Sequence, residues 1–257
     1  LSSNLVQNPS FSEEGVQEVS NGSFSQEGSE LVVNGDFALN SSWSGTNTIA
    51  NGQLIKGSGG GLVYQGTLDG TIKSYKVTID VAEKNGVSLN LYLGGNQFSL
   101  NEGVQTLYVQ SGNSNTFIGF NNGADSIINS ISCVEVGQDW SLGTGWSIAE
   151  DKAICDGTSG NLYQVGTVTP NKQYKIQATI SDYVSGNAEV SAGAVPRGTM
   201  SANGTYTFYQ TASTTSNFFV VSNSFNGSIT NISVKEVGMD WTLTSGAFIT
   251  DIGARLT

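Results

Sequence analysis

Histidine is absent from this chain of 257 residues, and charged residues, proline and cysteine are all scarce. Without histidine, the usual catalytic triads and most zinc sites cannot be built. Charged residues make up 12% of the chain, about half the usual share. The polar surface must therefore come from Ser, Thr, Asn, Gln and Gly. Aromatic content is 9%, whereas disordered chains combine high charge with few aromatic residues, so the sequence predicts folded domains.

The balance of charge narrows the range of partners. The net charge is −11, which opposes binding to nucleic acid and to anionic membranes. No cluster of Lys and Arg offsets it, and no apolar run approaches the ~18 residues of a membrane-spanning helix. We therefore expect neither a nucleic-acid partner nor membrane insertion.

The chain has two cysteines, Cys133 and Cys155. The position that matches Cys133 in the second copy of the repeat described below is Val234, so we expect Cys133 to pack as a small hydrophobic residue. A disulfide between the two cysteines would cross the predicted boundary between two domains, and we do not expect one.

One stretch of the chain occurs twice. Residues 129–140, NSISCVEVGQDW, are echoed 101 positions later by residues 230–241, TNISVKEVGMDW. Four further blocks match in the same order at offsets of 99 to 103: 36–43 with 139–146, 61–65 with 160–164, 74–77 with 173–176, and 101–108 with 202–209. Insertions in loops would produce such small changes of offset. A period of about 100 residues fits a whole small domain rather than a solenoid unit.

These repeats predict four segments. Residues 1–37 form an N-terminal segment, 38–137 a first domain, 138–238 a second domain, and 239–257 the start of a third, truncated repeat. A simple tail at 239–257 is the alternative. Because the third repeat stops early and the chain begins at Leu1, we expect the sequence to be part of a longer polypeptide. The four tryptophans lie in the opening strands of the repeats, where we expect core and junction packing: Trp43, which we match with Trp146, and Trp140 and Trp241.

The N-terminal segment holds a second, shorter repeat. Asn-(Gly/Pro)-x-Phe occurs three times at 13-residue spacing, each time with a valine two positions before the asparagine: Asn8 to Phe11, Asn21 to Phe24 and Asn34 to Phe37. Asn-Gly and Asn-Pro predict tight turns, in which Phe11, Phe24 and Phe37 can anchor on a surface. Thirteen residues cannot bury a core alone. The turns therefore pack on a partner chain or side by side, unless the segment is a flexible linker.

Both domains show short strands between turns rich in Gly and Asn. Residues 75–81 alternate between apolar and polar side chains, as a half-buried strand does. Asn85-Gly86 predicts a hairpin from this strand into residues 87–93, with Val87 on the same face as Leu89, Leu91 and Leu93. About eight short strands in roughly 100 residues favour a two-sheet sandwich or jelly roll. We predict an all-β fold of tandem antiparallel β-sandwich (jelly-roll) domains.

Residues 34–37, Asn-Gly-Asp-Phe, with Trp43 downstream, resemble the opening strand of galactose-binding-like jelly rolls of the carbohydrate-binding-module type. The run 140–157, followed by 162–164 and 233–237, is similar to tandem modules of bacteriophage tail-fibre and other virion proteins. The resemblance covers residues 30–238. It implies a non-enzymatic, sugar-binding module of a virion appendage or capsid decoration.

The same resemblance implies a structural Ca²⁺ beside an acidic residue that follows the phenylalanine of the motif. That position is Ala38 here, which puts a calcium site at Asp36 in doubt. In the second copy the motif has become Gly137-Gln138-Asp139-Trp140, which departs further from the family pattern. We therefore expect no metal and no other cofactor.

Sugar binding requires an aromatic face flanked by polar groups. The candidates are Tyr92 and Phe98, around a Gly-Gly turn, and Tyr183 and Arg197 in the corresponding region of the second domain. The alternative is that Tyr92 is an ordinary strand residue and Arg197 a solvated loop charge. The carboxylates do not recur in pairs between the repeats, whereas a glycosidase needs two of them at a set distance, so we expect no catalysis.

Three functions are open at this stage. The first is a virion structural protein, a tail or head fibre or a capsid decoration, that presents tandem β-sandwiches and attaches to host-surface glycans. The second is a secreted bacterial carbohydrate-binding adhesin. The third is an extracellular filament whose subunits add their N-terminal segment to the next subunit as a strand. The expected partners are further copies of the chain, a trimer among the options, or other virion proteins, at a virion surface or outside the cell.

Overall fold

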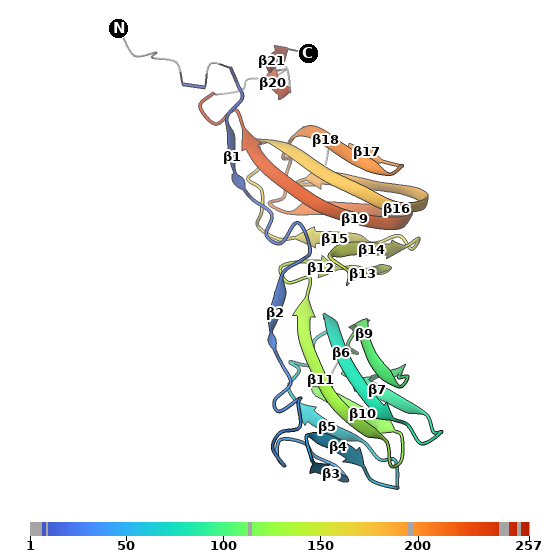
Figure 1. Ribbon diagram of the computed structural model, residues 1–257. Helices are drawn as coiled ribbons and strands as arrows, with labels where there is room; N and C mark the ends of the chain where they lie inside the picture. The colour runs from blue at the N-terminus through green and yellow to red at the C-terminus, as the bar shows by residue number, and fades with distance from the viewer. Residues whose placement is uncertain are drawn as a thin grey trace. The chain divides into compact units, whose positions relative to one another are not determined.

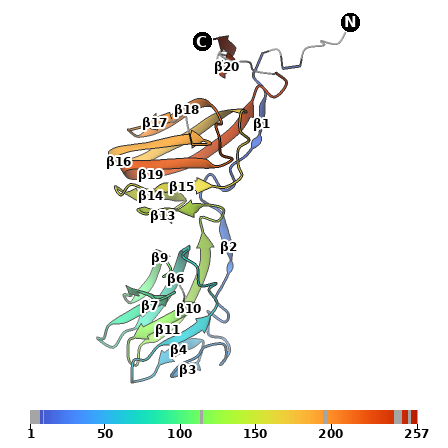
Figure 2. The same ribbon diagram turned by 180° about the vertical axis from the view of Figure 1, so that it is seen from behind.

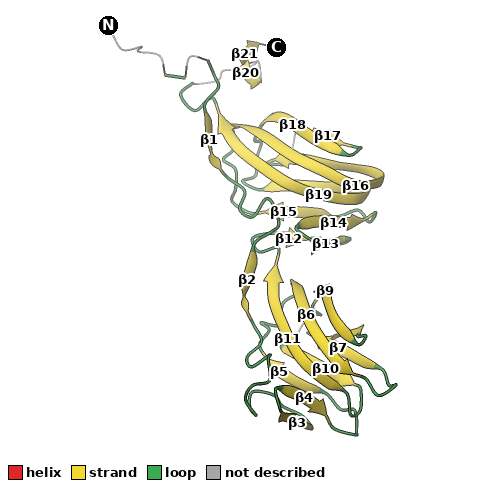
Figure 3. Cartoon of the chain, viewed as in Figure 1, coloured by secondary structure: helices red, strands yellow, loops and turns green. Residues whose placement is uncertain are grey.

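The computed structural model describes residues 7–8, 10–112, 115–194, 198–241, 247–250 and 253–256. Strands are its regular elements, and no helix occurs in the described ranges (Figure 3). It follows that no described helix is long and apolar enough to cross a membrane. Contacts divide the chain into two compact units: unit 1 comprises Leu1–Gln26 and Asp139–Thr257, and unit 2 comprises Glu27–Gln138. The N-terminal segment is thus shared between the units.

Unit 2 is a sandwich of two antiparallel sheets (Figure 1). The larger sheet has the order β3 (Asn47–Ala50), β4 (Gln53–Lys56), β11 (Ile127–Val136), β6 (Ser74–Glu83) and β9 (Gly103–Gln110), and β2 (Glu27–Glu30) also pairs with β11. The smaller sheet has the order β5 (Val63–Gly66), β10 (Phe117–Asn122), β7 (Leu89–Leu93) and β8 (Asn96–Ser99). Figure 2 shows the same strands from behind.

Alternation along the strands builds the core of unit 2. Every second residue of β6 from Tyr75 to Val81 is buried, as the sequence predicts, and so is every second residue of β7 from Leu89 to Leu93. Two residues of the N-terminal segment, Val32 and Phe37, belong to the same core. The core of this module is therefore completed by residues that precede it in the chain.

The predicted hairpin at Asn85-Gly86 is wrong. β6 pairs with β11 and β9, whereas β7 pairs with β10 and β8, so the turn carries the chain from one sheet to the other. Asn85 and Gly86 do have positive φ angles, of 53° and 75°, so the turn itself forms. Val87 is 39% exposed and does not share the buried face of Leu89. Turn chemistry predicted the reversal but could not predict which strands pair.

Unit 1 contains the second module, with the same order of strands. Its elements are β12 (Ser141–Leu142), β13 (Trp146–Ala149), β14 (Lys152–Asp156), β15 (Asn161–Gln164), β16 (Gln173–Ala192), β17 (Gly198–Met200), β18 (Gly204–Thr211) and β19 (Phe218–Val237), and β1 (Glu14–Gln17) pairs with β19. All its strand pairs are antiparallel. The fold is thus all-β, with tandem jelly-roll sandwiches as predicted.

Two long strands replace four shorter ones in this second module. β16 and β19 have 20 residues each and pass from one sheet layer into the other, where unit 2 has β6 then β7 and β10 then β11. The register between them shifts near Ser185, and Asp182 and Ser224 have positive φ angles of 55°. Each strand therefore bends within a single element, with a gap in the pairing between Ser181 and Ser185, and the predicted strands at 174–180 and 188–192 are one element.

A hairpin follows the second module. β20 (Ala247–Thr250) pairs with β21 (Gly253–Leu256), at the position that the repeat matches with β13 and β14. Gln173, which is buried, bonds to this hairpin twice: its Oε1 accepts from the Ile249 N–H at 2.7 Å and its Nε2 donates to the Ile249 carbonyl at 2.9 Å.

Both cysteines are free and buried, and the burial of Cys133 confirms the prediction from Val234. Cys133 lies in the core of unit 2, where burial raises the pKa of its thiol. Cys155 occupies the position in β14 that Lys56 has in β4. Lys56 is buried, donates to the carbonyls of Gly61 at 2.6 Å and Phe120 at 3.0 Å, and has a pKa lowered to about 8 by burial.

Candidate functional site

Each of the three 13-residue repeats contains the same tight turn. Its asparagine and its phenylalanine both have positive φ angles: 43° at Asn8, 46° at Asn21, 54° at Asn34, 56° at Phe11, 58° at Phe24 and 53° at Phe37. In each copy the phenylalanine N–H donates to the asparagine carbonyl, and the asparagine Oδ1 accepts from the backbone N–H five residues later. Asparagine adopts this left-handed conformation readily, but a bulky phenylalanine does so only when its surroundings hold it there.

A tryptophan holds each phenylalanine. The ring centroids are 4.9 Å apart for Phe11 and Trp241, 5.1 Å for Phe24 and Trp140, and 5.5 Å for Phe37 and Trp43. Each tryptophan Nε1–H also donates to the carbonyl of the asparagine in the same repeat, at 3.0 to 3.2 Å. The aromatic contact and the hydrogen bond together position the turn, because the indole is satisfied only when the turn is in place.

The repeats meet the modules in reverse order. The third repeat docks on Trp43 of the first module, the second on Trp140 of the second, and the first on Trp241, which follows the second module. Phe24 and Phe37 are each 1% exposed. The phenylalanines expected to pack on a partner therefore pack on tryptophans of their own chain. Trp43 has the role of Trp140, and not of Trp146 as the sequence alignment suggested.

Ahead of each turn, the segment pairs with the last strand of its module. We call residues 14–24 and 27–37 the docking segments. The dock of each is the second half of the last strand (β19 or β11), the opening tryptophan and a buried glutamine, Gln164 or Gln65. β1 pairs with Lys235 and Val237 of β19, and β2 pairs with Val134 and Val136 of β11. β4 pairs with Ile127 and Ile128 at the start of β11, and β14 pairs with Asn226 to Ile229 in the middle of β19. The docking segments pair with the end of each last strand, which would otherwise be an open edge.

The buried glutamine of each dock bonds to a single residue of the segment. Gln164 accepts from the Ser20 N–H at 3.0 Å and donates to the Ser20 carbonyl at 2.6 Å. Gln65 forms the same pair of bonds with Val33, at 3.0 and 2.5 Å. A primary amide presents one donor and one acceptor to the backbone, as a neighbouring strand would. Ser20 and Val33, which are held in this way, occupy equivalent positions in the two docking segments.

Side chains of the segment set its register on the strand. Glu14 accepts from Lys175 at 2.6 Å and from Lys235 at 3.0 Å, and Glu27 accepts from Lys76, the counterpart of Lys175, at 2.7 Å. Three residues further along each segment, Gln17 accepts from the Val234 N–H and the Ser233 hydroxyl, and Glu30 accepts from the Cys133 N–H and the Ser132 hydroxyl. The contacts repeat at 13 residues in the segment and at 99 or 101 residues in the modules.

A glycine in each docking segment allows its closest approach to the module. A Cβ on Gly22 would lie 2.0 Å from the carbonyl oxygen of Ile232, and one on Gly35 would lie 2.0 Å from that of Ile131. In both docks the glycine carbonyl accepts from the isoleucine N–H, at 2.9 and 2.8 Å. The Asn-Gly pair is thus required by backbone contact with the module as well as by the turn.

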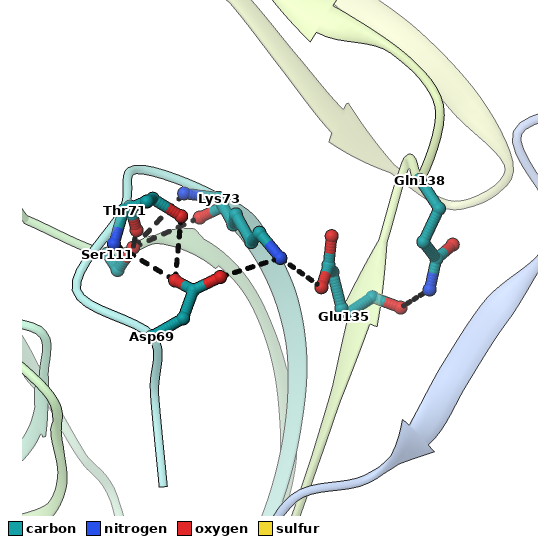
Figure 4. A network of polar contacts seen from close by, with 6 residues as sticks. All are labelled: Asp69, Thr71, Lys73, Ser111, Glu135 and Gln138. Carbon is teal, nitrogen blue, oxygen red and sulfur yellow. Dashed lines mark hydrogen bonds and ion pairs between the residues drawn. The ribbon is translucent and has the colours of Figure 1, made fainter.

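In each module a lysine forms an ion pair with a glutamate of the last strand, close to the residues that pair with the docking segment. Figure 4 shows the network in unit 2. Lys73 Nζ lies 2.9 Å from both Asp69 and Glu135, the Thr71 hydroxyl donates to Asp69 at 2.7 Å, and the Gln138 amide donates to the Glu135 carbonyl at 2.9 Å. The Thr71 hydroxyl and then Lys73 hold the pKa of Asp69 well below its usual range, and Glu135 and Asp69 raise the pKa of Lys73. In the second module, Lys172 and Glu236 form the matching pair at 2.6 Å.

A second candidate site is the outer face of the smaller sheet in unit 2. Tyr64, Gly119, Tyr92 and Gln97 are cross-strand neighbours on β5, β10, β7 and β8. Phe117 lies next to Tyr64, with ring centroids 4.3 Å apart. Tyr64, Tyr92 and Phe117 are all half-buried. Gly119 lies between the two tyrosines in the register. It is buried, and a Cβ there would lie 1.9 Å from the Val63 carbonyl oxygen, so β5 and β10 approach closely at this point.

Amides surround these rings. The Asn90 and Asn121 amides both donate to Gln97 Oε1 at 3.1 Å, and Asn115 donates to the Tyr92 hydroxyl at 3.0 Å. We call Tyr64, Tyr92, Phe117, Asn90, Gln97 and Asn121 the aromatic face. The shared acceptor orients both asparagine amides and leaves the NH₂ group of Gln97 turned outward for a further partner.

The other predicted ligand residues lie elsewhere. Phe98, on β8, is the register partner of Leu91 and packs against the core of unit 2. It therefore does not share a face with Tyr92. Tyr183 lies at the bend of β16, where its hydroxyl donates to the Gly186 carbonyl at 3.0 Å and its ring is 6.4 Å from that of Phe225. Arg197 lies outside the described residues.

The corresponding face of the second module has different chemistry. Its register places Phe219 where unit 2 has Gly119, Ser191 in place of Tyr92, and Glu189 in place of Asn90. Tyr163 is retained, 5.7 Å from Phe219. Because Phe219 replaces a glycine and Ser191 replaces one of the two tyrosines, the second module lacks the pair of tyrosines and can serve as a control.

Metal ligands do not gather in the parts of the chain that the structure describes: no group of three or more Asp, Glu or Cys residues there could hold an ion. Asp36, the residue that the calcium expectation concerned, accepts from the N–H of Ala38 at 3.2 Å. That contact is a local turn and adds no second ligand.

Replacing Gly35 by valine should destabilise the chain by about 2 kcal/mol or more, because the new side chain would collide with the Ile131 carbonyl. Urea unfolding followed by tryptophan fluorescence measures this change. Gly59→Val is the matched control, because nothing lies within 4 Å of a Cβ at that position. Equal destabilisation by the two variants would contradict the close contact.

Acid should weaken the docking of residues 14–24, because Glu14 would lose its charge. Lys175, and then Lys235, lower the pKa of Glu14 from the ordinary value of 4.5. The ionised carboxylate therefore stabilises the folded state above that value, and this stability is lost as the pH falls through the lower folded pKa. The urea midpoint of the wild type should fall more than that of Glu14→Gln between pH 6 and pH 3. Parallel curves for the two proteins would show that the ion pairs add nothing.

No protein-family model matches the chain, and no curated protein does. Among solved structures, the chain is similar to allantoicase from Saccharomyces cerevisiae, with 12% identity over 72% of this chain and 76% of that one and a TM-score of 0.31. The tandem CBM22-1-CBM22-2 domain of Paenibacillus barcinonensis Xyn10C has 7% identity over 82% of this chain and 99% of that one, with a TM-score of 0.30.

Proposed function

We propose that this chain is a non-enzymatic carbohydrate-binding protein whose jelly-roll modules are each completed by a docking segment. The aromatic face of unit 2 is the binding surface. The observation that carries this proposal is the row Tyr64, Gly119, Tyr92 and Gln97 across four neighbouring strands.

The chemistry of this row suits a sugar ring. Pyranose rings present patches of C–H groups that pack on aromatic rings, and hydroxyls that need both donors and acceptors. Tyr64 and Tyr92 supply the rings, and the amides of Gln97 and Asn121 supply the polar groups. The described outward positions of β5, β10, β7 and β8 carry neither Asp nor Glu, so a neutral glycan can bind there without burying a charge. A glycosidase would require two carboxylates on such a face.

The setting of this binding protein is also a proposal. Tandem modules with few charges suit a virion fibre or decoration that attaches to host-surface glycans. Mass spectrometry of purified particles tests this idea, because a virion protein must be found there in constant proportion to the capsid. A secreted bacterial adhesin is the second candidate, favoured by the same aromatic face, and it predicts the protein in the culture medium without particles.

Glycan binding should depend on both tyrosines of the row. A glycan array with the full chain identifies the ligand, and calorimetry then measures its affinity. Tyr64→Ala and Tyr92→Ala should each weaken binding roughly five- to tenfold, because each removes one aromatic contact. Gln97→Ala should weaken it through the lost amide.

The control is Tyr163→Ala, which changes the matching position of the second module and should leave the affinity unchanged. A chain that binds no glycan on the array would end the proposal. So would equal losses in Tyr92→Ala and Tyr163→Ala, because the aromatic face would then have no special role.

A further inference from the structure

We propose that the docks are sequence-specific peptide-binding sites and that their segments are exchangeable, so that the dock of one copy of this chain takes residues 14–24 of a second copy. The proposal does not depend on sugar binding. It rests on three features of the docks. Each dock contacts a short segment along its whole length, and both docks use the same contacts. In addition, the long stretch of chain between residues 14–24 and their dock does not fix which copy supplies the segment.

Recognition is complete within eleven residues. The docking segment 14–24 contacts its dock through Glu14 and Gln17 at one end and through the Ser20 backbone in the middle. At the other end the Gly22 carbonyl and the Phe24 ring make the contacts. Val19 and Phe24, at 2% and 1% exposed, enter the core. Main-chain pairing together with pockets for apolar side chains is how an added peptide is recognised at a sheet edge.

The two docks use the same contacts in the same order. Gln65 and Gln164 bond to the backbone of Val33 and Ser20, which are 13 residues apart in the segments, and Trp43 and Trp140 receive the two phenylalanines. A segment that fits one dock therefore satisfies most of the groups of the other. Lys235 is the main difference, because its counterpart is Val134, so the second dock should prefer Glu14 through one additional ion pair.

A whole module separates residues 14–24 from their dock in the sequence. Residues 14–24 dock on a module that begins at Asp139, more than 100 positions later in the sequence. The segment supplies no core of its own, and its folded form is defined by the dock. Without it, Val234 to Val237 would lie at an open strand edge, which pairs readily with another chain.

A second copy of the chain is the matching occupant. It carries the Glu-Gly-x-(Gln/Glu) and Asn-Gly-x-Phe sequences at the spacing that the docks read. Its glutamate meets the two lysines of the dock, Lys175 and Lys235, in a protein with a net charge of −11. The tether within one copy favours the internal segment through effective concentration, so exchange should require release of that segment or a high concentration of protein.

The first test supplies the segment as a synthetic peptide. The full chain with Gly22→Val has an intact dock, but its own segment would collide with the Ile232 carbonyl. A fluorescein-labelled peptide of residues 13–26 should bind this variant saturably in an anisotropy titration, and at least about tenfold more weakly to the wild type, whose dock is occupied. A peptide with Phe24→Ala should lose at least about tenfold in affinity. A peptide of residues 26–39 should also bind, because the docks are alike.

Circular dichroism must show that the Gly22→Val chain keeps its strand content. If the folded variant binds no peptide, or binds the Phe24→Ala peptide equally well, the docks are not separable binding sites and the proposal fails. If the variant unfolds, the second test decides in its place.

The second test traps exchange between copies. Gln17 and Lys235 are register partners in β1 and β19, so cysteines at these positions lie within disulfide reach. One copy carries Gln17→Cys and the other Lys235→Cys, and both are unfolded in urea and refolded together at high protein concentration. A mixed disulfide between the copies should form on oxidation. Replacing the second copy by Thr205→Cys, an exposed position on β18, should give at least about fivefold less product. Equal yields with both copies, or no mixed disulfide at all, would overturn the proposal.

Discussion

The structure depends on a short peptide that pairs with a strand more than 100 residues away. β4 pairs only with the start of β11, and β14 only with the middle of β19, so neither strand covers the end of the last strand of its module. The docking segment pairs with this end and closes the edge. Its phenylalanine then packs on the opening tryptophan of the same module. Burial of the ring, backbone pairing and a buried glutamine act at adjacent positions, so that none of them can shift without the others.

The docking explains how a segment that cannot build a core of its own stays folded ahead of the modules: apolar side chains such as Phe24 and Phe37 are buried against the modules. The repeats of 13 residues and the modules of about 100 residues run in opposite orders. The main contacts of one dock recur in the other, except the ion pair between Glu14 and Lys235. Phe24 in its left-handed conformation is a local strain that only the tryptophan can offset. Each module thus obtains a paired strand and a buried phenylalanine from a separate part of the sequence.

The sequence predicted what local patterns encode. Alternation marked the buried positions of β6, the Asn-Gly pairs marked the turns, and spacing alone revealed both repeats. The partners of Phe11, Phe24 and Phe37 could not be predicted, because pairing between distant strands leaves no periodic signal. The same limit explains the hairpin at Asn85-Gly86. It also explains why Tyr92 was recognised and Tyr64 was not, since the neighbouring strands of β7 were unknown. Phe98 was chosen because it flanks the Gly-Gly turn, and the register of β8, which the sequence does not give, places it on the inner face between the exposed residues Gln97 and Ser99.

The central claim is that each repeat docks on the module that the reversed order assigns to it. Nuclear Overhauser contacts between aromatic rings of the folded chain in solution measure this directly. The account predicts contacts of the Trp140 indole with the Phe24 ring and of the Trp43 indole with the Phe37 ring. Contacts that join Phe24 to Trp43, or phenylalanines of the repeats to one another, would contradict it.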